Sequence, residues 1–399
     1  MARILISLVG GRPLPNILVA LHLKADSLYF IASKDSVGEG GNYQKAVDAL
    51  PSNLKPIKSY FVEPYSIQST KDACQNIVNK CAANDEIIVN SASEPKIMAF
   101  GAYDITKQLR TENKNRQIDL CYLGTDGLFW IFKDNKEPVT IDIKTYFSSY
   151  GWNIKHKDII EKIIDTKKLE QLSLLFIEHE QIHIYQRLLK SIRKKSEGKG
   201  KRTCKSEKCL SDEEFNLFKK IEEIGIVSNL KRSDNGTSWT INSQEDGEIL
   251  LGGEWLEYYV YRKASTLVNN KGKRIFQECL WGAEDISGKG EIDFVGIRGG
   301  QIVICSCKTE NGINKKMFED LHSKAEQLGK GMCSSLLIST VLKTTRKDID
   351  LQRYNRWAKE RRVILILAED ILKIDLILRK VILAEKDAEP HEVPYYPRI

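Results

Sequence analysis

Residues 1–90 alternate short apolar runs with helical patterns, and this alternation constrains the fold more than any other feature. The runs with strand character cover residues 4–9, 28–32, 57–62 and 86–90. Helical patterns at 17–23 and 69–81 lie between them. Such alternation predicts a parallel, doubly wound α/β sheet. Further runs predict later strands, antiparallel at the sheet edge, at residues 119–123, 129–132 and 139–144.

The chain has 399 residues, of which 42% are hydrophobic and 29% charged. This length exceeds one ordinary core and predicts at least two domains. No apolar run reaches the roughly 20 residues of a membrane span. The apolar run at residues 4–9 ends at Gly10-Gly11, as is expected of a buried first strand. We expect a cytoplasmic protein without a membrane segment. Nine scattered cysteines favour free thiols over disulfides or a zinc site.

The pattern changes twice after the first domain. From about residue 154 it becomes helical, and Ser211-Asp212-Glu213-Glu214 has the form of a capping box. Residues 226–240 fit either a winged-helix element or a plain connector. Strands are then predicted at 275–281, 291–298, 301–307, 334–340 and 363–368, with helices at 255–263, 314–328 and 349–360. We therefore expect domains at residues 1–145 and 245–399, with a helical connector at 146–244.

The net charge of +7 is concentrated in one segment of the connector. The basic run consists of Lys190, Arg193, Lys194, Lys195, Lys199, Lys201, Arg202 and Lys205. It is either a solvated helix end with a flexible linker or a contact for nucleic-acid phosphates.

The last domain contains an ordered set of acids and a lysine. Glu257 lies near the start of a predicted helix, and Glu291 and Asp293 lie two apart on a strand, which places both on one face. A hairpin leads to the next strand, where Ser306 and Lys308 share a face. Taken singly, each residue fits a structural role. Together they fit phosphodiester hydrolysis, in which Glu257, Asp293 and Glu291 hold Mg²⁺ or Mn²⁺ and Lys308 assists the attacking water.

This order resembles the PD-(D/E)XK restriction-endonuclease-like family. In the resemblance Glu257 takes the helix position, Asp293 the aspartate position and Lys308 the lysine position. Ser306 stands where the family carries an acid, so Glu291 or Glu254 is expected to supply the further carboxylate. The resemblance implies a metal-dependent endonuclease with Glu257, Asp293, Lys308, Glu291 and Ser306 in its active site.

Two loops of the first domain follow strands at the edge where open parallel sheets bind ligands. The first loop begins Gly10-Gly11-Arg12-Pro13 and reaches Asn16, and the second is Ser91-Ala92-Ser93-Glu94-Pro95-Lys96. Glycines, hydroxyls and a cation before a helix suit phosphate. Either loop alone also fits an ordinary turn, and neither has a Walker A or dinucleotide motif.

The pair of loops on a Rossmann-like domain resembles the CARF domain of type III CRISPR accessory proteins. The order of domains over residues 1–145 and 245–370 is similar to the cyclic-oligoadenylate-activated nucleases, in which Ser-x-Lys also occurs. The resemblance implies a homodimer with one composite pocket for cyclic tetra-adenylate, or less favourably cyclic hexa-adenylate. The ligand residues expected are Gly10, Gly11, Arg12, Pro13, Asn16, Ser91, Ser93, Glu94 and Lys96.

Three functions follow from these patterns. The first is a ligand-activated endonuclease that nicks supercoiled DNA, cuts single-stranded DNA or cuts single-stranded RNA. The second is a ligand-controlled nucleic-acid-binding regulator whose nuclease domain is inactive. The third is a plain restriction or repair nuclease that does not respond to cyclic nucleotides.

Overall fold

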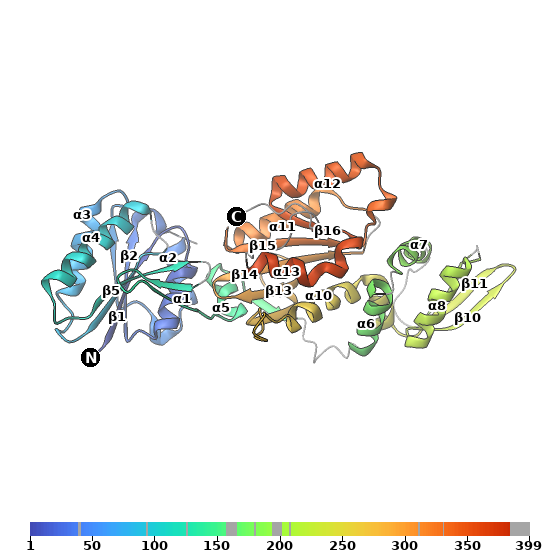
Figure 1. The fold of residues 1–399 in the computed structure, drawn as a ribbon, viewed down its shortest axis with the longest axis horizontal. Helices are drawn as coiled ribbons and strands as arrows, with labels where there is room; N and C mark the ends of the chain where they lie inside the picture. The colour runs from blue at the N-terminus through green and yellow to red at the C-terminus, as the bar shows by residue number, and fades with distance from the viewer. Residues whose placement is uncertain are drawn as a thin grey trace.

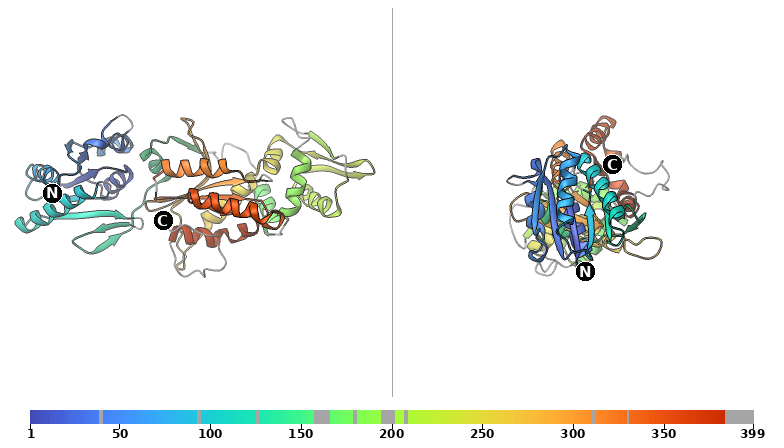
Figure 2. Two further views of the ribbon diagram at one scale, coloured as in Figure 1. Left: turned by 90° about the horizontal axis from the view of Figure 1, so that it is seen from above. Right: turned by 90° about the vertical axis from the view of Figure 1, so that its left-hand side faces the viewer.

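The computed structural model describes residues 1–38, 41–92, 95–124, 127–156, 166–178, 181–193, 202–206, 209–309, 312–329 and 331–383. Three units lie one after another along the long axis of the molecule, as Figures 1 and 2 show. They are an N-terminal α/β domain, a central α/β domain that holds most of the C-terminal half, and a small α+β unit at the far end.

The N-terminal domain is built on a seven-stranded sheet in the order β3-β2-β1-β4-β5-β6-β7. Its strands are β1 (Arg3–Val9), β2 (Ser27–Ser33), β3 (Lys58–Val62), β4 (Glu86–Asn90), β5 (Ile118–Gly124), β6 (Gly127–Trp130) and β7 (Asn135–Glu137). Strands β1 to β5 are parallel, which confirms the doubly wound sheet, and β6 and β7 are antiparallel at its edge. The expectation that β5 is antiparallel is wrong, because β5 pairs with β4 inside the parallel part.

Helices cover both faces of this sheet because every strand of its centre is apolar on both faces. They are α1 (Leu14–Leu23), α2 (Asn42–Ala49), α3 (Ile67–Val78) and α4 (Lys96–Glu112). Ile4, Ile6 and Leu8 of β1 pack in one core with α3 and α4. Leu5 and Val9 point to the opposite face and pack with α1. This period of two is the one expected of a strand.

The strand predicted at 139–144 is wrong. Asp142 caps a helix there by accepting the backbone N–H of Thr145 at 2.8 Å, so α5 (Ile143–Ser149) begins where the strand was expected to continue. Val139 and Ile141 are buried because the segment that connects β7 to α5 packs against the core. This burial explains why apolar residues alternate there without forming a strand.

The central domain has a six-stranded sheet in the order β16-β15-β14-β13-β12-β8. Its strands are β8 (Ile154–His156), β12 (Glu278–Asp285), β13 (Glu291–Arg298), β14 (Gln301–Lys308), β15 (Cys333–Ser339) and β16 (Val363–Ile366). Its helices are α10 (Glu254–Thr266), α11 (Lys315–Gln327), α12 (Asp348–Arg361) and α13 (Ile374–Leu383). α10 packs on one face with Phe294 and Val303, and α11 and α12 pack on the other with Ile304 and Leu337.

The connector is only partly helical. A helix was expected from about residue 154, but Ile154–His156 forms the edge strand β8 against β12. The helices that follow are α6 (Thr166–Ser173) and α7 (Ile182–Arg193). Of the basic run, Lys194, Lys195, Lys199 and Lys201 lie outside the described residues.

The small unit combines one helix with a three-stranded sheet. Ser211 forms the expected capping box with Glu214 and starts α8 (Asp212–Ile224). The hairpin of β10 (Val227–Ser233) and β11 (Gly236–Ile241) follows, with β9 (Arg202–Ser206) on its other edge. Phe218 packs on Trp239 at a ring distance of 4.8 Å. A helix followed by a hairpin has the form of a winged element, which was the less favoured of the two alternatives for residues 226–240.

Among the described residues, no helix combines the length and apolar character that crossing a membrane requires.

Candidate functional site

The β13–β14 hairpin holds Asp293 and Lys308 together. The antiparallel ladder runs from the pair Arg298 and Gln301 to the pair Phe294 and Cys305. Beyond that pair, the side chain of Asp293 links the two strands in place of the backbone, because its Oδ2 accepts a hydrogen bond from the backbone N–H of Cys307 at 2.6 Å. The ammonium of Lys308 lies 3.6 Å from the same oxygen.

Ser306 lies beside Asp293, where its hydroxyl donates to Oδ2 over 3.4 Å. Among the described residues, the hydrogen bonds and the ion pair of Asp293 all go to Oδ2, which leaves Oδ1 for a ligand. A serine here therefore orients the aspartate rather than adding a negative charge.

Glu257 approaches from α10. The indole N–H of Trp281, on β12, donates to Glu257 Oε2 at 3.2 Å and fixes the half-buried carboxylate. The Trp281 ring is held edge-on against Tyr258 with centroids 5.4 Å apart. Trp281 of β12 thus positions the Glu257 side chain of α10.

The two carboxylates act on the charge of Lys308. Burial acts to lower the pKa of this lysine, but Asp293 and Glu257 oppose it and hold the pKa above its usual value. Lys308 is therefore a cation at neutral pH, close to both acids. Such a group stabilises negative charge and does not serve as a base.

The other acids occupy different places. Glu291 is exposed on β13, and its backbone carbonyl accepts the ammonium of Lys324, on α11, at 2.6 Å. Glu254 is buried as the first residue of α10. Lys324 was not predicted, because only the packing of α11 brings it to this edge of the sheet.

A divalent metal fits this site only with two protein carboxylates. No group of three His, Cys, Asp or Glu side chains is placed to hold a metal ion in the described part of the chain. Asp293 and Glu257 both lie near Lys308, and Mg²⁺ is commonly bound through one or two carboxylates with water completing its shell. The donor set therefore suits Mg²⁺ or Mn²⁺ and is unlike the tetrahedral sets of zinc.

The loops of the N-terminal domain meet where the strand order reverses, between β1 and β4. A buried network supports them: the hydroxyl of Ser7 donates to Asn16 Oδ1 at 2.8 Å, and Asn90 Nδ2 donates to that hydroxyl at 2.8 Å. Asn16 also donates to the carbonyl of Arg12 at 3.3 Å. Asn16, expected to contact ligand, is thus fully buried and supports the first loop from below.

Among the described residues of the two loops, Gly11, Arg12 and Lys96 are exposed. Pro13 is the N-cap of α1, and Lys96 is the first residue of α4; neither helix has a side-chain cap. Gly10 and Ser91 are buried, and the Ser91 hydroxyl donates to the carbonyl of Cys121 at 3.4 Å. Ser93 and Glu94 lie outside the described residues.

Arg12 acts electrostatically on Tyr150, at the end of α5. Burial raises the pKa of Tyr150, and the nearby charge of Arg12 opposes that shift. The neighbouring hydroxyl of Tyr146 donates to the carbonyl of Leu328, at the end of α11, at 2.7 Å. The first loop leads into α1, which contacts α5, and α5 in turn contacts the central domain through Leu328.

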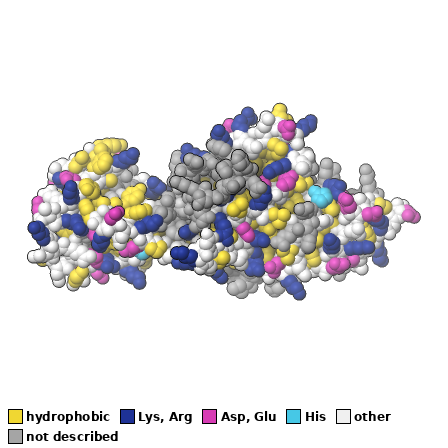
Figure 3. All heavy atoms as spheres, viewed as in Figure 1, with side chains coloured by type: hydrophobic (Ala, Val, Ile, Leu, Met, Phe, Trp, Pro, Cys, Tyr) yellow, Lys and Arg dark blue, Asp and Glu magenta, His cyan; other side chains and the backbone are white. Residues whose placement is uncertain are grey.

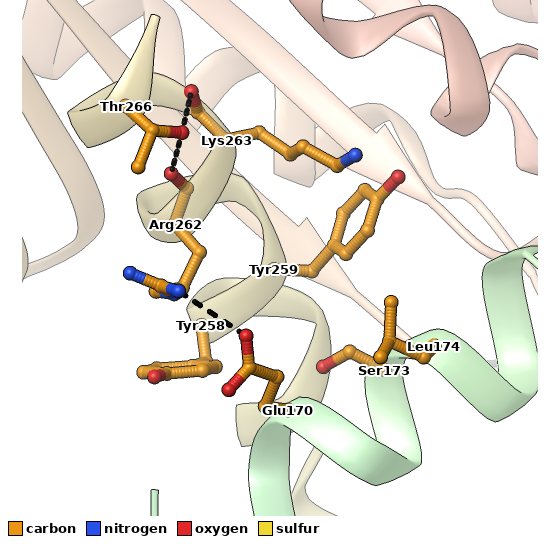
Figure 4. Close-up of a pocket in the computed structure, with 8 residues that line it drawn as sticks. All are labelled: Glu170, Ser173, Leu174, Tyr258, Tyr259, Arg262, Lys263 and Thr266. Carbon is orange, nitrogen blue, oxygen red and sulfur yellow. Dashed lines mark hydrogen bonds and ion pairs between the residues drawn. The ribbon is translucent and has the colours of Figure 1, made fainter. Parts of the chain in front are cut away.

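A pocket of about 190 Å³ lies elsewhere, between α6 and α10 (Figure 4). Its polar lining is largely paired within the chain: Arg262 reaches Glu170 at 3.2 Å, and the Thr266 hydroxyl donates to the carbonyl of Arg262 at 2.8 Å. None of the predicted site residues lines it. We assign the chemistry to the residues around Asp293 and not to this pocket.

Solved structures share the arrangement of an N-terminal sheet with a loop cluster at its switch point, followed by a second α/β domain. Protein VC1899 from Vibrio cholerae shares it with a TM-score of 0.67 and 17% identity, over 96% of this chain and 98% of that one. Can2 from Sulfobacillus thermosulfidooxidans, in complex with cyclic tetra-adenylate, gives a TM-score of 0.67 and 14% identity over 95% and 97%.

A type III CRISPR defence DNA nuclease activated by cyclic oligoadenylate is also similar, with a TM-score of 0.52 and 14% identity. This chain covers 45% of that longer one, and 85% of this chain is matched. No protein-family model and no curated protein matches the sequence. The predicted fold class is confirmed by these structures.

Proposed function

We propose that this protein is a metal-dependent endonuclease activated by a cyclic oligoadenylate in type III CRISPR antiviral defence. The observation that carries the proposal is that Asp293, Glu257 and Lys308 converge in a chain whose whole length follows the fold of Can2. Cyclic tetra-adenylate is the proposed activator, because Can2 was solved with it, and cyclic hexa-adenylate is the less favoured one.

In this proposal each residue of the site has a definite role. Asp293 and Glu257 hold Mg²⁺ or Mn²⁺, which when bound supplies a water of lowered pKa, and Glu291 lies at the rim of the site. Lys308 balances the negative charge that develops on the attacked phosphate. Ser306 keeps Asp293 oriented through its hydroxyl.

The proposed ligand contacts are the backbone at Gly10 and Gly11 and the cations of Arg12 and Lys96, with Pro13, Ser91, Ser93 and Glu94 in the surrounding loops. Asn16 supports them through Arg12. A two-fold symmetric ring suits a homodimer in which both copies contribute these loops. The proposed substrates are supercoiled DNA, which is nicked, single-stranded DNA and single-stranded RNA.

The first prediction concerns Lys308. Purified protein with Mn²⁺ is expected to cleave plasmid DNA or a labelled single strand when cyclic tetra-adenylate is present, and Lys308→Ala is expected to lower the cleavage rate about 100-fold or more. Lys316→Ala, which removes an exposed lysine of α11, is the matched control and should cleave as the unaltered protein does. Cleavage that is independent of the ligand would favour the plain nuclease instead.

One observation favours a second function. Ser306 replaces an acid, and the described residues hold no three-ligand metal group. The alternative is therefore a ligand-controlled nucleic-acid-binding regulator with an inactive nuclease domain. Ligand binding and polynucleotide binding without cleavage, under any metal, would establish it.

A further inference from the structure

Lys324 enters the site from the outer face of the sheet. It lies on α11 beside Leu321 and Ala325, which pack into the core, and it is half-buried. Its ammonium donates to the carbonyl of Glu291 at 2.6 Å. Lys324 therefore lies at the start of β13, before the first residue of that strand that pairs with β14, Phe294.

The chain leaves room for this side chain at Gly290. A Cβ atom at that position would lie 3.2 Å from Cε and 3.4 Å from Nζ of Lys324, and Gly290 has a φ of +119°. The turn before β13 therefore both adopts a conformation suited to glycine and passes close to the ammonium. Lys324 is held in place from two sides, by this turn and by the Glu291 carbonyl.

Lys324 belongs to the same electrostatic cluster as the nuclease residues. Burial is the main cause that lowers its pKa, and Asp293, Glu291 and Asp320 oppose the shift while Lys308 adds to it. Lys308 lies 3.6 Å from Asp293, and Lys324 binds the carbonyl of Glu291, two residues before Asp293 on the same strand. A second cation is more than one aspartate needs for an ion pair, whereas a nucleic-acid strand brings one negative charge for every phosphate.

We infer that Lys324 is a second cationic residue of the nuclease site and contacts a backbone phosphate of the substrate strand next to the one attacked at Asp293. The inference rests on the proposed function and deepens it. Among the described residues, Lys324 donates to one carbonyl, which uses one of its three donors, so two donors can reach phosphate oxygens. Sequence-independent contact of this kind contributes affinity and positions the strand.

The test separates the charge of Lys324 from its hydrogen bond. Lys324→Gln keeps a donor for the Glu291 carbonyl but removes the charge, and Lys324→Arg keeps the charge. Binding of labelled single-stranded and duplex DNA is measured in EDTA across a NaCl series. For Lys324→Gln the slope of log affinity against log salt is expected to shrink by about 0.7 on single strands and about 0.9 on duplex. Lys324→Arg and the control Lys316→Gln are expected to keep the slope.

Cleavage and stability complete the test. Where the unaltered protein cleaves, the rate of Lys324→Gln is expected to fall at least about tenfold, with a smaller loss for Lys324→Arg. An unchanged salt slope in Lys324→Gln would overturn the inference. A loss of DNA binding that is fully explained by unfolding of the variant, seen as a lowered melting temperature, would overturn it as well. A protein that binds DNA through Lys324 but never cleaves would refute the proposed endonuclease and leave standing only the contact between Lys324 and a backbone phosphate.

Discussion

At the scale of single residues, the site depends on side chains that never reach the substrate. Trp281 donates its indole N–H to Glu257 at 3.2 Å and is itself fixed against Tyr258. Groups that orient a metal-binding carboxylate commonly change metal affinity or activity by about 10–100-fold when they are removed. Trp281 is therefore a positioning residue whose importance can be measured.

Trp281→Phe keeps an aromatic ring against Tyr258 and removes the indole N–H together with part of the buried ring system. We expect the Mn²⁺ concentration for half-maximal cleavage to rise about 10–100-fold, because Glu257 loses its orientation. Trp152→Phe is the control: within the described chain, the Trp152 indole N–H has no hydrogen-bond partner. The role assigned to Trp281 would be refuted by a metal titration that matches that of the control.

Residue-level prediction succeeded where the chemistry follows the local period of the chain. Asp293 and Lys308 lie on adjacent strands of one hairpin, so their spacing in sequence was enough to predict that they meet. Lys324 and Trp281 reach the site only through the packing of separate elements, which no local pattern contains. The ligand contact of Asn16, at the end of the first loop, stays a prediction, and in the structure its amide binds Ser7 and Arg12 inside the domain.

At the scale of elements, α10 begins under a tight steric constraint. Gly253 has a φ of +90°, and a Cβ atom there would lie 2.7 Å from Oγ1 of Thr309, the residue after Lys308. One contact thus fixes the start of the helix that carries Glu257 against the end of the strand that carries Lys308. Glycine is required here for its conformation and for the close approach.

Gly253→Ala is expected to lower the free energy of unfolding by about 1–3 kcal/mol through backbone strain, with a further loss from the contact with Thr309. Cleavage should also slow, because Glu257 and Lys308 are forced apart. Gly252→Ala is the control, since a Cβ atom at Gly252 meets nothing within 4 Å. Denaturant unfolding measures the effect. Adding Thr309→Ala to Gly253→Ala should regain only the stability that was lost through the contact with Thr309. A Gly253→Ala variant as stable as Gly252→Ala would show that glycine is not required at position 253.

Elements were predicted well where periodicity and capping agreed. The strands β1, β4, β13 and β14 and the capped helix α8 fall where the sequence placed them. Failures came where apolar alternation had another cause. Residues 139–144 alternate because a connection packs on the core, and residues 154–156 join a sheet whose other strands lie more than a hundred residues later. Such long-range pairing leaves no trace in a local pattern.

At the scale of the whole molecule, the N-terminal domain exposes apolar surface on one pair of helices. Phe100 and Tyr103 of α4 are 60% and 42% exposed, and Ile67 at the start of α3 is 44% exposed. A Cβ atom at Gly101 would lie 2.9 Å from the carbonyl of Ile67, so the two helices touch here and these side chains form one patch. Figure 3 also shows hydrophobic side chains gathered on this domain.

The patch continues the proposed ligand site. Lys96, Phe100 and Tyr103 are spaced along α4 as residues i, i+4 and i+7, which places them on one side of the helix with Lys96 at the end near the switch point. In a two-fold dimer, the apolar face of one copy can pack against the apolar face of the other. The cationic loops beside these faces then lie together, where both copies can contact one ligand. We therefore expect a homodimer through α3 and α4.

Phe100→Asp tests this expectation, because it places a charge in the expected apolar interface, where burying it without a partner costs free energy. The dimer dissociation constant is expected to rise about 100-fold or more, measured by analytical ultracentrifugation, and activation by cyclic tetra-adenylate should fall with it. Ile349→Asp is the matched control, since Ile349 is 70% exposed on α12 of the other domain. A Phe100→Asp protein that remains dimeric would move the interface away from α4, whereas a monomer that still responds fully to the ligand would show that one copy of the loops is enough.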